Sequence, residues 1–264
     1  MVMRRQTITI MLIIMSDIST HLTLQTWISA AFPTGAFTCS HGLETAIADE
    51  RINNADTCLQ WISTIMQYGS GWNDAILMAN TCALIAAVHP EAFQNDSQPR
   101  THDRHCTSEM TALKTSLNEI NDLALALCAG AERLRETTQL GAAFVKAATP
   151  WFAGKSSIPL QWIDADISLP IATGICGSLA GIPAVQLLPA SLQASSSNLV
   201  WIATRLVPLG QTQALEIIAA LAPIIESTAL LALHSPLDDI GSGALLADLC
   251  SIEHEQLQTR ICIT

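Results

Sequence analysis

The chain has 264 residues, of which half are hydrophobic and 13% are charged, so a sizeable core is expected and overall disorder is excluded. The formal net charge of −11 argues against a nucleic-acid-binding protein, which needs a basic face. Eight cysteines occur singly without a CxxC pair, which favours buried free thiols in a reducing cytoplasm over a disulfide framework.

The first fifteen residues contain two arginines followed by an apolar run, Ile8 to Met15. This run is shorter than the ~20 residues that span a bilayer, and no small-residue cleavage site follows it. We therefore expect a loose extension over residues 1–17 and no membrane span, with weak membrane contact as the alternative.

The segment 32–44 reads Phe-Pro-Thr-Gly-Ala-Phe-Thr-Cys-Ser-His-Gly-Leu-Glu. Pro33 and Gly35 suit a tight turn, and Ser40 is predicted to cap the helix that follows. Glu44 falls in the first turn of that helix, where the helix dipole favours an anion. The segment predicts a capped turn that leads into a polar helix start.

Helical periodicity continues through most of the chain, beginning with Leu59, Ile62, Ile65 and Met66. Further helices are expected over 74–88, 113–127 and 132–148, with a flexible polar loop at 90–110 and a connector at 149–170. Short helices at 169–182, 184–194 and 199–207 are expected to be separated by prolines, and Pro223 to kink or interrupt a helix over 212–233. Strand evidence is thin, so residues 18–264 predict one all-α, bundle-like domain of roughly ten helices.

Two further motifs follow in the second half of the chain. Residues 205–212 read Arg-Leu-Val-Pro-Leu-Gly-Gln-Thr, and their spacing predicts a helix–loop–helix corner in which Thr212 caps the second helix. The C-terminal helix is predicted to have an apolar face with Leu245, Leu249 and Ile252. Its opposite face is polar and consists of Asp248, Ser251, His254, Glu255 and Gln258.

These segments together resemble the urease accessory protein F family. Residues 32–44 are similar to its N-terminal signature, 134–141 to its Leu-Arg…Gln-x-Gly run, and 205–212 to its Arg-Leu-x-Pro-Leu-Gly-Gln-Thr motif. The family ends in Ser-x-x-His-Glu-x-x-x-x-Arg, matched here by Ser251, His254, Glu255 and Arg260. This chain departs from the pattern at Leu169, where a His is usual, at Cys39, where an aromatic is usual, and in lacking aromatics after Glu255.

The resemblance implies a non-catalytic, homodimeric assembly protein without a bound cofactor or metal. It would bind accessory protein D (H in some organisms) and the nickel-carrying accessory GTPase G on apo-urease, and so promote nickel insertion. The resemblance assigns Gly35, Phe37, Ser40, Gly42 and Glu44 to the dimer and GTPase-facing surface, which Arg205 and Gln211 would support. It assigns Ser251, His254, Glu255 and Arg260 to the segment that docks on accessory protein D.

Two other functions remain open from the residues. The chain could activate the GTPase through an arginine that reaches the developing phosphate charge, with Arg205 or Arg260 as the candidates. It could also be a helical metalloenzyme that uses His41, Glu44, His254 and Glu255, although local hydrogen bonding among them is favoured.

Other candidate groups are weaker. The set His102, Asp103, His105 and Cys106 could bind a metal ion but is expected to be a solvated loop. No P-loop or GxSxG motif occurs in the sequence. Cys39 is expected to be a buried thiol rather than a nickel ligand.

Overall fold

The structure is a computed structural model that describes residues 18–88, 104–152 and 166–264. Within these ranges every regular element is helical, which confirms the all-α prediction. The extension at 1–17 and the loop predicted at 90–103 lie outside them, whereas residues 104–110 belong to a helix. After a helix at 18–27, the α-helices are α2 (Leu43–Ala48), α3 (Ala55–Tyr68), α4 (Ser70–Val88), α5 (Arg104–Ala126), α6 (Ala131–Ala148), α7 (Leu169–Leu179), α8 (Ala184–Leu206), α9 (Gln211–Ala232) and α10 (Leu245–Glu253).

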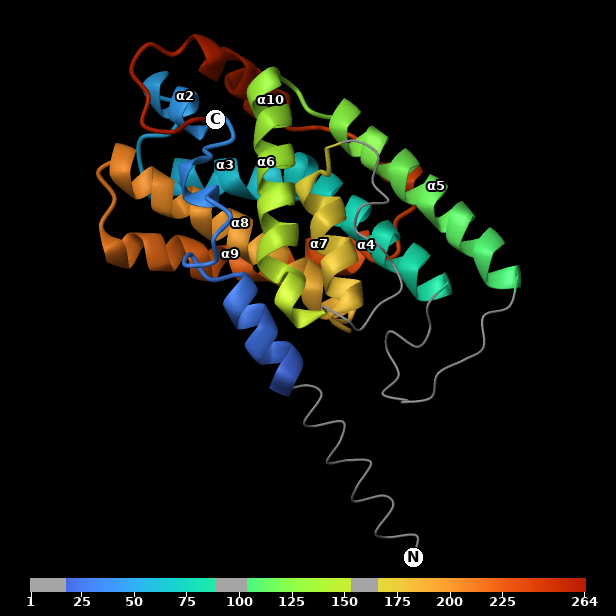
Figure 1. The fold of residues 1–264 in the computed structure, drawn as a ribbon. Helices are drawn as coiled ribbons and strands as arrows, with labels where there is room; N and C mark the ends of the chain where they lie inside the picture. The colour runs from blue at the N-terminus through green and yellow to red at the C-terminus, as the bar shows by residue number, and fades with distance from the viewer. Residues whose placement is uncertain (1–17, 89–103, 153–165) are drawn as a thin grey trace, which may run out of the picture.

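Helices α4 and α7 form the centre of the molecule (Figure 1). Every α7 residue from Pro170 to Leu179 is buried, and α4 buries side chains on all sides, as a helix enclosed by others must. The two helices cross closely at Gly174, where a Cβ atom would lie 2.9 Å from Cβ of Thr81. Helices α3, α6, α8 and α9 pack around this pair.

The apolar spacing read from the sequence is confirmed in α3, where Ile62, Ile65 and Met66 are buried. The predicted breaks at Pro183 and Pro208 are also confirmed, since α8 begins at Ala184 and ends at Leu206. The break at Pro189 is wrong, because α8 runs unbroken through it, and α9 continues through Pro223. A proline inside a helix costs about 3 kcal/mol, and α8 offsets this by burying a row of leucines and packing along α9.

Two helical stretches, 55–88 and 211–232, are long and apolar enough to cross a membrane by length and composition alone. The first includes the central helix α4, and 56% of its most apolar window is buried inside the protein. Leu221 and Ile225 of the second stretch also belong to the core. Both stretches therefore supply side chains to the interior of this fold.

The two ends of the described chain are held at different places on the body (Figure 1). Helix 18–27 projects from the body and is anchored by Trp27, which packs edge-on against Phe144 and Trp151. The C-terminal end instead lies beside α2, close to α10. The segment 32–44 and the C-terminal motif, far apart in sequence, meet here.

Four short 3-10 helices complete the described part of the chain: η1 (Ala36–Thr38), η3 (Thr149–Trp151), η5 (Leu237–Asp239) and η6 (His254–Gln256). Two of them, η1 and η6, flank the place where the C-terminal segment joins α2.

Candidate functional site

A left-handed turn joins η1 to α2 and brings this segment against α10. His41 and Gly42 have positive φ angles of 51° and 74°. A Cβ atom on Gly42 would lie 2.4 Å from the backbone nitrogen of Ser251, so glycine is needed here. The predicted cap is wrong, because the turn separates Ser40 from a helix that begins only at Leu43. The Ser40 hydroxyl is buried and has no hydrogen-bond partner within the described chain.

Glu44, in the first turn of α2, binds the C-terminal tail formed by residues 260–264. Its carboxylate accepts the backbone N–H of Ile261 at 2.6 Å and that of Cys262 at 2.9 Å. Burial raises the pKa of Glu44, but these two hydrogen bonds and nearby His254 outweigh it and hold the pKa below 4.5. An ionised and almost fully buried acid therefore fixes the tail.

The tail is also bonded to the turn through its backbone. Ile263 donates its N–H to the carbonyl of Thr38 at 2.9 Å, and Ser40 donates to the carbonyl of Thr264 at 2.6 Å. The Thr264 hydroxyl donates to Glu136 at 2.7 Å. Residues 38–44 and 260–264 are thus one structural unit.

His254 is completely buried between two acids from different helices. Its Nδ1 lies 2.7 Å from Oε2 of Glu132 in α6, and its Nε2 lies 3.3 Å from Oε2 of Glu44 in α2. Glu132 also accepts from Nη1 of Arg260 at 2.5 Å. Burial raises the pKa of Glu132, but His254 and Arg260 outweigh it and lower the pKa below 4.5. The imidazole therefore ties α2, α6 and the tail together.

Glu255, the neighbour of His254, points to the start of α6. Its Oε1 accepts the N–H groups of Ala131 at 2.8 Å and Glu132 at 3.3 Å. A carboxylate at this position satisfies free backbone donors and complements the helix dipole. Glu255 is therefore a capping residue supplied by a distant part of the chain.

A second charged cluster lies on the other side of the tail. Oε1 of Glu136 lies 2.7 Å from Nε2 of His41 and 3.0 Å from Nη1 of Arg133, and Nη2 of Arg133 reaches Asp74 at 3.2 Å. Burial raises the pKa of Glu136, but His41 and Arg133, with the hydroxyl of Thr264, lower it to about 2. Glu136 is therefore ionised and committed to internal partners.

The acids and the arginine of α6 are not among the site residues expected from the sequence. Glu132, Arg133 and Glu136 fall in the helix predicted over 132–148, and all three are buried. A helical wheel carries the signal, because Arg133 lies on the same face as the buried Leu140 and Phe144. Charges in register with an apolar stripe indicate an internal network.

A cavity of about 580 Å³ opens between helix 18–27, the 32–42 turn and α8. Phe37 and Trp201 line it and are 54% and 38% exposed, and Arg205 lies beside them. Asn198 donates from Nδ2 to the carbonyl of Ala36 at 2.8 Å, which fixes the turn against α8. The cavity therefore presents both aromatic and cationic side chains to the surface.

Cys39 lies under this cavity and is buried. Burial, with the nearby charge of Glu136, raises the pKa of its thiol to about 11. The structure therefore agrees with the expectation of a buried thiol.

The corner at 205–212 is exposed at both of its predicted site residues, Arg205 at the end of α8 and Gln211 at the start of α9. The predicted Thr212 cap is wrong, because α9 begins one residue earlier, after Gly210. The side chain of Gln213 accepts the N–H of Gly210 at 2.9 Å and so satisfies a backbone donor at the start of α9.

The apolar face that the sequence predicts for the C-terminal helix is exposed to solvent. Leu245, Leu246, Leu249 and Ile252 are 66%, 52%, 43% and 41% exposed. The side that carries Cys250 and leads to His254 packs inward. This orientation brings His254 to the acids of α2 and α6, which are its partners inside the protein.

The four candidates for a metalloenzyme do not converge on one point. His254 contacts Glu44, but His41 turns to Glu136 and Glu255 caps α6. The favoured expectation of local hydrogen bonding therefore describes their arrangement. The side chains of His102, Asp103, His105 and Cys106 lie outside the described part of the chain.

Comparison with known proteins gives consistent matches. A profile of the UreF family matches residues 52–222. A urease accessory protein UreF of Cereibacter sphaeroides (strain ATCC 17025 / ATH 2.4.3) is 39% identical over 240 residues, which cover 91% of this chain and 96% of that protein. Proteins of the same name from Rhodopseudomonas palustris (strain BisA53) and Bradyrhizobium sp. (strain ORS 278) are 34% and 36% identical over 239 residues, covering 90% of this chain and 90% and 89% of their own.

Proposed function

Because the chain belongs to the UreF family of urease accessory proteins, we propose that it acts as a non-catalytic scaffold in the cytoplasm. It joins accessory protein D/H and the accessory GTPase G on apo-urease, and nickel is the cargo of that assembly. The internal pairing of Glu44, Glu132, Glu136 and His254 supports a structural rather than a catalytic use of these groups.

The exposed apolar face of α10 carries this proposal. Leu245, Leu246, Leu249 and Ile252 stand on one helix and are exposed, as are Ile261 and Ile263 of the tail. Adjacent large apolar side chains in water are typical of protein-binding surfaces. The contacts of Glu44, His254 and Glu255 hold this face in position. We therefore assign it to accessory protein D/H, with Ser251, His254, Glu255 and Arg260 acting by positioning it.

The paired change Leu245→Asp and Leu249→Asp tests this assignment. Both side chains are exposed, so the fold should persist, while binding of accessory protein D/H in a pull-down should fall at least a hundredfold, as for other central interface residues. Leu230→Asp with Leu231→Asp is the matched control, because those α9 leucines are 49% and 63% exposed. Undiminished binding by the α10 variant would refute the assignment.

The aromatic cavity beside α8 supports the homodimer. Phe37 and Trp201 border it, together with helix 18–27, whose Ile18 and Leu22 are 54% and 57% exposed. We assign this face, including Gly35, to contact with a second copy. Phe37→Asp should shift the mass in solution to that of a monomer, measured by light scattering. Val185→Asp, at a similarly exposed position, should leave the mass unchanged; an unshifted Phe37→Asp variant contradicts the assignment.

Activation of the GTPase is the second candidate function, and the exposed Arg205 favours it over Arg260, which is engaged with Glu132. An activating arginine raises GTP turnover by 10³–10⁵. If the chain activates, Arg205→Ala should abolish the stimulation, whereas Arg135→Ala on exposed α6 surface should not. Equal turnover with and without the chain leaves scaffolding as its role.

A further inference from the structure

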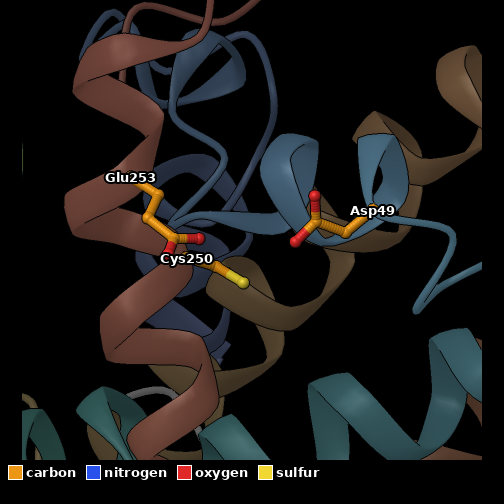
Figure 2. A group of neighbouring side chains, drawn as sticks. All are labelled: Asp49, Cys250 and Glu253. Atoms are coloured by element: carbon orange, nitrogen blue, oxygen red, sulfur yellow. The ribbon is translucent and has the colours of Figure 1, made fainter.

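Three potential metal ligands meet where α2 ends against α10 (Figure 2). The carboxylates of Asp49 and Glu253 and the thiol of Cys250 have ligand atoms that all lie within 4.8 Å of one another. Among the described residues, this is the one group of three His, Cys, Asp or Glu side chains whose ligand atoms lie so close together. None of the three takes part in the tail network of Glu44 and His254.

The fold places these ligands from two directions. Cys250 and Glu253 are three residues apart on α10 and so share one face of that helix. Asp49 is the residue that ends α2, and its carboxylate points across the gap toward α10. Helix α2 packs along α10, and the Gly42–Ser251 approach fixes the other end of this contact. The backbones that carry the ligands are therefore held in place.

We propose that Asp49, Cys250 and Glu253 form a binding site for one borderline divalent cation of the zinc, nickel or cobalt class. A thiolate selects such ions over magnesium and calcium, which prefer six or more oxygen ligands. Ligand bonds of about 2.3 Å to sulfur and 2.1 Å to oxygen give a sulfur–oxygen separation of about 3.6 Å in a tetrahedral site. The present separations, all within 4.8 Å, need to close by at most about 1.2 Å, which rotation of the two exposed carboxylates supplies.

The charges around the site favour a cation. Two carboxylates lie near the thiol, and one of them, Asp49, is paired with Arg51, whose Nε lies 3.3 Å from Oδ2 of Asp49. That pair is nearly half exposed on both sides, so it is weak. On binding, the Cys250 thiol transfers its proton to solvent as the sulfur–metal bond forms. A water molecule completes the four ligands.

This site would clamp α10 to α2 and so hold the exposed leucine face of α10. The proposal is compatible with the expectation that no tightly bound metal is present, because two of the three ligands are exposed and the ion can exchange with solvent. It does not rest on the scaffold function, since the purified chain alone should bind the ion.

Titration of the purified, tag-free, reduced chain with Co²⁺ tests the site. We expect one equivalent to produce a near-ultraviolet sulfur-to-metal charge-transfer band, which Zn²⁺ then removes by displacement. Cys250→Ser should abolish the band. Asp49→Asn and Glu253→Gln should each weaken binding tenfold or more.

Controls keep the result decisive if Cys250→Ser fails to fold. The two carboxylate variants change exposed side chains and should leave the melting temperature of the metal-free protein unaltered. Cys128→Ser, at a partly buried cysteine elsewhere, should keep the band. The proposal is overturned if no band appears, or if the band persists at full affinity in both carboxylate variants. If the purified chain binds no metal but still binds accessory protein D/H, the metal-site proposal fails and the scaffold proposal does not.

Discussion

Replacing Glu44 with glutamine should release the C-terminal tail without unfolding the helices. Glutamine keeps the size of the side chain but removes its charge and turns one acceptor into a donor. The donors it faces include the N–H groups of Ile261 and Cys262, at 2.6 and 2.9 Å from the carboxylate. A hydrogen bond to a charged group contributes about 1.5–3 kcal/mol. Losing one of these bonds, removing the charge from the other and setting an NH₂ group against a buried N–H should cost about 3 kcal/mol locally, which corresponds to a hundredfold or greater increase in tail opening.

Hydrogen exchange of the Ile261 and Cys262 amides measures this directly. Both should exchange at least a hundredfold faster in Glu44→Gln, while the amides of α4 and α7 keep their protection. Glu216→Gln, on the exposed surface of α9, is the matched control and should change neither.

Acid should reproduce the substitution in the unaltered protein. Because the pKa of Glu44 is lowered, its contribution is complete above pH 4.5 and is lost as the pH falls through the lowered pKa. Unchanged exchange of both amides in a folded Glu44→Gln variant would refute the reasoning.

Two further predictions concern stability. Glu136 has a pKa lowered from 4.5 to about 2, so its ionised form stabilises the fold by about 3 kcal/mol above pH 4.5, and this stabilisation is lost as the pH falls toward 2. Urea unfolding at several pH values should show that Glu136→Gln is less stable at neutral pH. The variant should also lack the loss of stability that Glu136 contributes between pH 4.5 and 2. Gly42→Ala should lower the free energy of unfolding by more than 2 kcal/mol, because the added Cβ would lie 2.4 Å from the backbone nitrogen of Ser251. Gly35→Ala is also at positive φ but has no neighbour within 4 Å, so it should cost about 1 kcal/mol. Equal melting temperatures for the two variants would contradict the close approach at Gly42.

The helices were predictable because their apolar spacing is local information. Ile62, Ile65 and Met66 repeat with the helical period and are buried as expected. Breaks at Pro189 were predicted wrongly, since the packing that offsets a proline comes from other helices. Local pattern therefore predicts where helices exist better than where they end.

The candidate site was predictable in its members but not in its contacts. The sequence marked Glu44, His254 and Glu255, yet it could not show that Glu132 lies between His254 and Arg260. It also identified the apolar face of α10, but not that this face is exposed, although an apolar stripe on a helix usually faces inward. The direction a helix faces depends on partners that lie far away in the chain.

The contact between Glu44 and the tail sets an order on synthesis. Glu44 and Ile261 are 217 residues apart, so at 5–20 residues per second their pairing waits roughly 10–40 seconds after α2 emerges. During that interval the acid has no tail to bind, and α2 lacks α10 as well. Residues 38–44 therefore gain these partners only after residues 260–264 have been made, and a product that stops earlier should leave Glu44 without the two backbone donors of the tail.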